Sequence, residues 1–114
     1  VASFDDAIVV HGGIDPTRAL SDHTPAELLT MRAPLGSGYD GPFWYEDYDG
    51  PHRVFFGHTV HERPVDREYA VGLDTGCVYG GQLTAYDYRR GRFVTVDPTA
   101  THRERSNDEI AAVR

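Results

Sequence analysis

Three short apolar segments, rich in β-branched and aromatic residues, are separated along this chain by polar, glycine-containing stretches. They cover residues 6–10 (DAIVV), 53–56 (RVFF) and 69–74 (YAVGLD), and each is followed closely by a polar residue and a glycine. Short runs of this composition are typical of buried β-strands, whose side chains fill both faces of a sheet. The pattern therefore predicts a sheet whose strands lead directly into glycine-containing loops.

A short helix is predicted between the first two of these segments. Thr24 can cap the helix, Pro25 suits the first helical position, and Glu27 completes a capping box. The apolar and basic residues LLTMR continue the helix, and a proline and glycines then follow closely. We therefore expect the helix to end near Arg32.

The rest of the chain is predicted to form a structured loop, a hairpin and a tail. Residues 34–52 are rich in glycine, proline and aromatic residues and show no clear period. We expect the aromatic residues 43–45 to hold this loop in place by packing against the rest of the protein. Residues 83–88 and 93–96 predict a β-hairpin around Arg90-Gly91. Together these elements indicate a mixed α/β (α+β) fold with one helix and about five strands, in a sheet that is incomplete on its own.

Composition narrows the possible partners. The chain has 114 residues, 18 acidic and 11 basic side chains, and a formal net charge of −7 at pH 7. Such a surface repels nucleic-acid phosphates and anionic membranes, so no nucleic-acid binding and no membrane binding are expected. No apolar run approaches the ~20 residues of a membrane span. A single cysteine, Cys77, excludes an internal disulfide and fits a reducing, cytoplasmic location.

The polar residues at the strand ends are the candidates for chemistry. His11 and His58 each lie beside a glycine directly after a predicted strand. Loops on the ends of a rigid sheet commonly carry catalytic groups, and glycines let a ligand approach closely. Two neutral imidazoles could share a metal ion, but a hydrolytic site needs further ligands and an open position for water. A purely structural role for both histidines remains an alternative.

Longer strings around these positions resemble a known family. V-V-H-G-G-I-D-P at 9–16, V-F-F-G-H-T at 54–59 and L-D-T-G-C-V-Y-G-G-Q-L-T-A at 73–85 are together similar to the calcineurin-like metallophosphoesterases. The branch they resemble contains the phosphoprotein phosphatases and the related prokaryotic bis(5'-nucleosyl)-tetraphosphatases. The resemblance covers residues 7–96, and the string at 73–85 is its most specific part.

The resemblance implies two sheets packed in a sandwich and a dinuclear metal centre at the loop ends. It makes His11 and His58 metal ligands, mainly of one of the two metals. It makes Arg32 a phosphate-binding residue, although a positive charge at the end of the helix is an alternative for this side chain. Tyr79 matches an aromatic residue beside the site in some members, and core packing is its alternative.

Other polar residues are set aside. His61 does not fit the spacing of the family's second ligand histidine and is expected at the surface. His23, His52 and His102 lie in polar stretches and are expected to be solvated. Asp74 is expected to fix a turn. Cys77 is expected to be a small buried residue rather than a nucleophile.

The chain also departs from the family pattern. The motifs D-x-H, G-D-x-x-D-R-G and G-N-H-E, which supply most metal ligands, do not occur in it, and it begins at Val1 with Met31 as its only methionine. We therefore expect residues 1–98 to be the C-terminal part of one metallophosphoesterase domain and residues 99–114 to be a polar tail. Such a chain, without the N-terminal half of its own domain, is expected to be inactive.

These observations predict a metal-dependent phosphoesterase. The leading hypothesis is hydrolysis of phosphomonoesters in the manner of a serine/threonine protein phosphatase, acting on a phosphoprotein or a small phosphoester. The alternative is a symmetrical bis(5'-nucleosyl)-tetraphosphatase that cleaves a dinucleoside polyphosphate. Two divalent metal ions, Mn²⁺, Fe, Zn²⁺ or Ni²⁺, are the expected cofactors. A third hypothesis, of another class, is a non-catalytic remnant or interaction domain.

Overall fold

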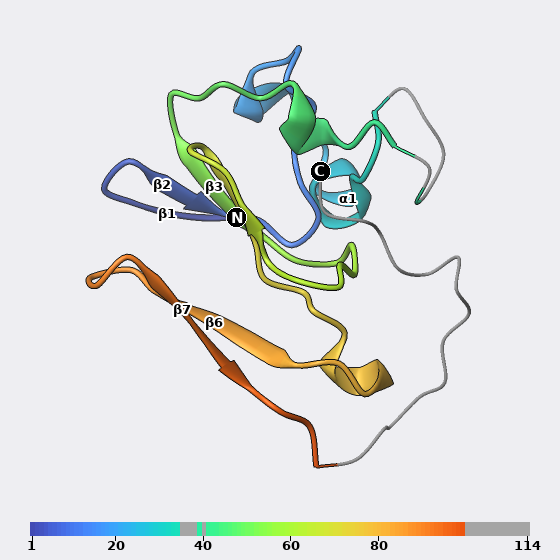
Figure 1. Cartoon of the computed structure of the whole chain (residues 1–114). Helices are drawn as coiled ribbons and strands as arrows, with labels where there is room; N and C mark the ends of the chain where they lie inside the picture. Colours follow the sequence, from blue (N-terminus) through green and yellow to red (C-terminus); the bar gives the residue numbers. More distant parts are fainter. Residues whose placement is uncertain (35–38, 40, 100–114) are drawn as a thin grey trace.

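The computed structural model describes residues 1–34, 39 and 41–99. Most of these residues belong to a five-stranded sheet, a two-stranded hairpin and the loops that cover them (Figure 1). The predicted mixed α/β class is confirmed, with one α-helix in the described part of the chain. Within these residues, no helix is both long and apolar enough to cross a membrane.

The five-stranded sheet has the order β1-β2-β3-β5-β4. Its three central strands, β2 (Ala7–Val9), β3 (Arg53–Phe56) and β5 (Ala70–Gly72), run parallel to one another. β1 (Ala2–Phe4) and β4 (Val65–Asp66) pair antiparallel on the two outer sides. The three predicted strands are therefore the core of one sheet, and their carboxyl ends lie along the same edge.

Side chains alternate between the two faces of this sheet because successive residues of a strand point in opposite directions. On one face, Ile8, Val54 and Phe56 pack against the aromatic residues 43–45, which are almost fully buried. On the other face, Phe55 and Val71 pack with side chains of the hairpin. The sheet is thus covered on both faces, as its parallel centre requires.

The covering elements include the predicted helix and hairpin, with small shifts of their bounds, and three 3₁₀ turns that the sequence analysis does not predict. They are α1 (Pro25–Thr30), the 3₁₀ turns η1 (Leu20–Asp22), η2 (Trp44–Glu46) and η3 (Cys77–Tyr79), and the hairpin strands β6 (Leu83–Asp87) and β7 (Arg92–Val96). The capping box of α1 is confirmed: the Thr24 side chain accepts from the Glu27 N–H, and the Glu27 carboxylate accepts from the Thr24 N–H. Figure 1 shows the hairpin on one side of the five-stranded sheet and α1 on the other.

The two outer strands were not predicted. β1 forms a tight hairpin with β2 through Asp5, whose φ of 48° is left-handed, and its three residues are too few to show a period. β4 has only two residues, too few to show a period. The predicted tail at 99–114 lies outside the described residues, apart from Thr99.

Close packing of the aromatic loop leads to a first prediction. A Cβ atom added at Gly13 would lie 2.2 Å from Nε1 of Trp44, whereas one added at Gly57 would meet nothing nearer than 3.8 Å. We expect Gly13→Ala to lower the free energy of unfolding by about 1–3 kcal/mol, because Trp44 is buried and cannot move aside freely. Gly57→Ala is the matched control and should change it by less than about 0.5 kcal/mol. Urea unfolding measures both, and equal effects would contradict the packing argument.

Candidate functional site

The edge where the three parallel strands end gathers the residues that the sequence singled out. His11 follows β2, His58 follows β3 and Asp74 follows β5. The ends are tied together by backbone hydrogen bonds, in which the Gly57 N–H donates to the His11 carbonyl at 2.9 Å and the Leu73 N–H donates to the Phe56 carbonyl at 2.9 Å. The carboxyl ends of parallel strands are a usual place for ligand binding. This edge is therefore the candidate site.

The two histidine rings face each other across this edge. Their centroids lie 5.1 Å apart, with an interplanar angle of 51°. His11 is exposed and His58 is half-buried. An open depression of about 740 Å³ lies beside them, lined at its polar end by His11, His58 and Asp74 and elsewhere by apolar side chains. The structure therefore brings together both histidines that the sequence proposed as ligands.

The loop that carries His11 is held against α1. The Gly12 N–H donates to the Leu28 carbonyl at 2.9 Å, and a Cβ atom on Gly12 would come within 2.9 Å of the Leu29 backbone. A glycine is therefore required for this close approach of the helix. Close packing against α1 thus explains the first glycine of the H-G-G motif.

His23 braces the same loop, and its predicted solvation is wrong. The ring is buried, accepts a hydrogen bond from the Asp15 N–H at Nε2 (2.7 Å) and donates from Nδ1 to the Ala19 carbonyl (2.9 Å). A backbone N–H can only donate and a carbonyl can only accept, so these bonds fix the tautomer with the proton on Nδ1. The polar sequence around His23 gave no sign that η1 would fold back over the loop. His52, by contrast, is exposed as predicted, and His102 lies outside the described residues.

His58 lies at the centre of a γ-turn. Its φ is 67°, and the Thr59 N–H donates to the Gly57 carbonyl at 2.7 Å across it. Three-residue turns with a positive φ at the centre are rare and strained for a residue that carries a Cβ. Strain of this kind persists only where surrounding contacts hold it, and it concentrates at functional sites.

The environment of His58 favours its neutral form. Burial, then the positive charge of Arg32 and then the neighbouring His11 ring lower the pKa of His58, while Asp74 acts in the opposite direction. The Nε2 atom of His58 is buried and has no hydrogen-bond partner among the described residues. A neutral imidazole with an unpartnered nitrogen is the state that a metal ligand requires.

Arg32 lies just beyond α1, which ends at Thr30 with Met31 as its C-cap. The guanidinium carbon lies 4.8 Å from the centroid of the Tyr39 ring, and Nε is buried without a hydrogen-bond partner among the described residues. None of the ion pairs found in the described part of the chain involves Arg32. Among the residues that the structure describes, its charge is therefore not paired with a carboxylate.

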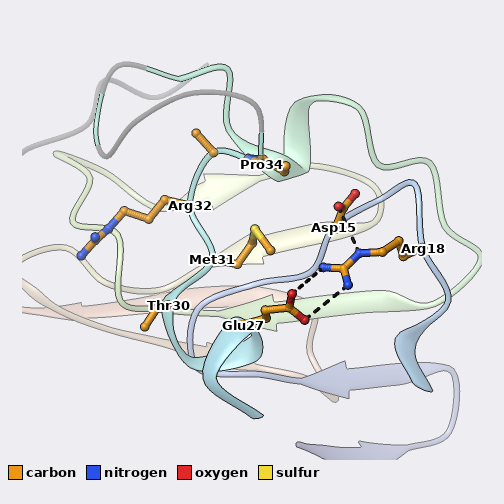
Figure 2. A pocket seen from close by; sticks show the side chains of 8 residues that line it. Asp15, Arg18, Glu27, Thr30, Met31, Arg32 and Pro34 are labelled. Atoms are coloured by element: carbon orange, nitrogen blue, oxygen red, sulfur yellow. Dashed lines mark hydrogen bonds and ion pairs between the residues drawn. The ribbon is translucent and has the colours of Figure 1, made fainter. Parts of the chain in front are cut away.

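A neighbouring arginine, Arg18, is fully paired instead. It bridges Asp15 and Glu27 with N–O distances of 3.2 Å to each, and so links the loop after β2 to α1. Figure 2 shows Arg18 between these two carboxylates, with the Arg32 side chain extending away from them. The two arginines thus have different roles, although both line the same polar pocket of about 330 Å³.

The motif at residues 73–85 contains a turn between two glycines. Gly76 and Gly80 flank η3 with φ values of 76° and 93°, a conformation that a side chain disfavours. The Gly76 N–H donates to the Asp74 carboxylate at 3.1 Å, which confirms the turn-fixing role predicted for Asp74. Cys77 is half-buried, although it was predicted to be buried. Tyr79 is half-buried in η3. It is not among the described residues that line the depression beside His11 and His58.

His61 is the clearest correction to the sequence predictions. It was expected at the surface, but its ring is only 2% exposed. It donates from Nδ1 to the Thr59 carbonyl (2.9 Å), and its Nε2 lies 3.1 Å from the Tyr45 hydroxyl. Phe43 and Tyr45 of the aromatic loop, which is distant in sequence, pack against its ring. No local signal could have found the contact.

Comparison with known proteins supports the family resemblance. A relative from Anoxybacillus flavithermus, named bis(5'-nucleosyl)-tetraphosphatase PrpE (asymmetrical), is 41% identical over 56 residues, which is 49% of this chain and 23% of the relative. A relative from Pseudomonas putida, named bis(5'-nucleosyl)-tetraphosphatase, symmetrical, is 37% identical over 100 residues and matches 75% of this chain and 35% of its own length. No protein-family model matches the chain.

A solved structure gives the same result. A protein assigned as a candidate diadenosine tetraphosphatase superposes with a TM-score of 0.64 at 31% identity, over 77% of this chain and 45% of its own. The resemblance to the tetraphosphatase branch of the calcineurin-like metallophosphoesterases is therefore confirmed. The chain spans less than half the length of each of these relatives.

The buried state of His61 leads to a prediction about pH. Burial lowers the pKa of His61, against smaller opposing effects of its hydrogen bond to Thr59 and of Asp74. As the pH falls, His61 therefore takes up a proton in the unfolded chain before it does so in the folded chain. Its contribution to the free energy of unfolding is complete above about pH 6.5 and is lost as the pH falls below that value. We expect the free energy of unfolding to fall between pH 7 and pH 5 in the natural chain and to fall less in His61→Gln.

His58, whose pKa is also lowered, keeps its contribution in that variant, so the pH dependence should shrink rather than vanish. Carboxylates with lowered pKa, such as Asp15 and Glu27, act below this range. Urea unfolding at several pH values measures the slope. An unchanged slope in His61→Gln would show that His61 can accept a proton in the folded protein.

Proposed function

We propose that this chain belongs to a metal-dependent hydrolase of dinucleoside polyphosphates and supplies part of its metal and phosphate site. The observation that carries the proposal is the pair of histidine rings, with centroids 5.1 Å apart, at the carboxyl edge of a parallel sheet. The charge of Arg32 acts on His58, and Arg32 forms no ion pair within the described part of the chain. Relatives named as tetraphosphatases support the substrate class.

The two histidines fit a role as metal ligands. Nε2 of His58 has no partner among the described residues, and its pKa is lowered, so the neutral ring is favoured. Among the described residues, however, no group of three or more histidine, cysteine, aspartate or glutamate side chains could hold a metal ion. The proposal therefore includes further ligands from outside the described residues. Divalent metals would stabilise charge on the phosphoryl oxygens and lower the pKa of a bound water.

Arg32 supplies the phosphate contact in this proposal. A guanidinium offers several donors in a fixed plane and matches phosphate oxygens well. Its buried, unpartnered Nε and its freedom from ion pairs in the described structure leave these donors available. Tyr79 stays a prediction as a substrate-binding residue.

The comparisons favour the dinucleoside polyphosphate over the phosphoprotein that was the leading hypothesis. The relative that matches three quarters of this chain is named as the symmetrical enzyme, and relatives named as asymmetrical match about half of it. We therefore propose symmetrical cleavage of the polyphosphate, with asymmetrical cleavage as the second candidate. The metal, among Mn²⁺, Fe, Zn²⁺ and Ni²⁺, stays a prediction, as does the cytoplasmic location.

Product analysis tests the proposed reaction. Protein expressed from the whole reading frame and supplied with Mn²⁺ should convert diadenosine tetraphosphate into two ADP, because symmetrical cleavage divides the four phosphates equally. AMP with ATP would indicate the asymmetrical reaction. Chromatography of the nucleotides distinguishes these outcomes, and a phosphoserine peptide run in parallel tests the phosphatase hypothesis.

His58→Ala is the control for that experiment, and its turnover should fall by more than about 100-fold if the ring holds the metal. Activity of His58→Ala within a few-fold of the natural protein would remove His58 from the site. A natural protein that shows no turnover of either substrate and no metal-dependent rise in melting temperature would favour the non-catalytic interaction domain.

Substitution of Arg32 tests the phosphate contact. Losing a hydrogen bond to a charged group costs about 1.5–3 kcal/mol, so we expect Arg32→Ala to reduce kcat/KM by about 10- to 100-fold. Arg90→Ala is the matched control, since Arg90 is exposed and pairs with Asp87 in the distant hairpin turn. Steady-state kinetics should show no change for Arg90→Ala. Equal losses in both variants would point to overall surface charge rather than to a specific contact.

A further inference from the structure

The strained turn at His58 raises the question of what holds it. The Gly57 carbonyl and Thr59 N–H close the γ-turn, and His58 between them has a φ of 67°. Backbone strain of this type costs on the order of 1–3 kcal/mol, so contacts around the loop must offset it. Nε2 of His58 does not provide one, because it has no hydrogen-bond partner among the described residues.

The side chain of His61 provides one such contact. Its Nδ1 donates to the Thr59 carbonyl at 2.9 Å, directly after the turn. A carbonyl can only accept, so the proton of the neutral ring lies on Nδ1 and Nε2 is left as an acceptor. The backbone N–H of His61 donates to the Asp74 carbonyl at 3.0 Å, which also ties this loop to the end of β5.

Tyr45 completes the arrangement from a different part of the chain. Its hydroxyl lies 3.1 Å from Nε2 of His61 and donates to it, given the tautomer that Thr59 imposes. The Tyr45 ring is 1% exposed and stacks on Phe56, with centroids 5.6 Å apart, so the hydroxyl has a fixed position. A chain of hydrogen bonds thus runs from the packed aromatic layer through His61 to the residue beside His58.

We propose that Tyr45 and His61 are positioning residues that hold His58 in the orientation needed to bind metal. The inference rests on the proposed function, because it presumes that His58 is a ligand. It goes beyond that function by assigning a role to two buried residues that are not among its proposed ligands or phosphate contacts. Supporting groups of this kind typically change metal affinity by about 10- to 100-fold.

Tyr45→Phe tests the proposal with the smallest change. It removes one hydroxyl and keeps the ring that packs on Phe56. We expect Mn²⁺ to bind about 10-fold more weakly, measured by competition with a chelator on protein from the whole reading frame. The value of kcat at saturating Mn²⁺ should recover towards that of the natural protein, because only the metal-bound fraction has changed.

Tyr48→Phe is the matched control. Tyr48 also loses a single hydrogen bond, from its hydroxyl to the His52 carbonyl at 2.7 Å, and its ring also contacts Trp44. It should lower the melting temperature by no more than Tyr45→Phe does, because its bond is exposed, and it should leave Mn²⁺ binding unchanged. Equal Mn²⁺ affinity in the natural protein, Tyr45→Phe and Tyr48→Phe would overturn the proposal.

Two substitutions at His61 separate its two hydrogen bonds. Asn at this position can place an N–H donor near the site of Nδ1, and Gln can place an acceptor near the site of Nε2. We expect His61→Asn, which keeps the bond to Thr59 and loses the bond to Tyr45, to weaken Mn²⁺ binding about as much as Tyr45→Phe does. His61→Gln should weaken it further, because it loses the bond to Thr59 next to His58. The reverse order would overturn this assignment.

These measurements separate the inference from the function on which it rests. Metal affinity is read without substrate, so the positioning role can fail while the hydrolase proposal stands. A natural protein that binds no Mn²⁺, Zn²⁺, Ni²⁺ or Fe²⁺ would instead overturn the proposed function and the positioning role together.

Discussion

The parallel pairing of three short strands is the constraint on which the rest of the structure depends. β2, β3 and β5 share one direction, so the residues that follow them meet at one edge, although they are far apart in sequence. Each strand contributes a polar residue there, and backbone hydrogen bonds between the strand ends fix their spacing. If either β2 or β3 reversed direction, the two histidines would lie at opposite ends of the sheet. The pairing requires cover on both faces, which the aromatic loop and the hairpin supply.

The central strands, the capped helix and the hairpin were predictable because their signals are local. A β-branched run, a capping box and a glycine turn each act within a few residues, and the structure contains all of them. The pairing of His11 with His58 was also predictable, because the motifs that place them are local strand ends. The outer strands β1 and β4 were not predicted because β1 has only three residues and β4 only two, too few for either to show a period.

The buried histidines mark the limit of such prediction. His23 and His61 lie in polar sequence, and each is buried by a segment that folds over it from elsewhere. Their partners, the Asp15 amide and the Tyr45 hydroxyl, are identified only by the tertiary structure. Each braces a loop that carries one of the candidate ligands. The residues that support the site were therefore harder to recognise than the residues that form it.

The connection between β2 and β3 also has a consequence for how the chain folds. About forty residues separate these neighbouring parallel strands, and this loop must close before their first hydrogen bond can form. The entropy of that closure is lost before any packing compensates for it, so folding should be slow for a chain of this size. For the same reason, the edge that carries His11 and His58 should form late in folding and together with the rest of the sheet. Its amide protons should exchange with solvent only when the whole sheet opens.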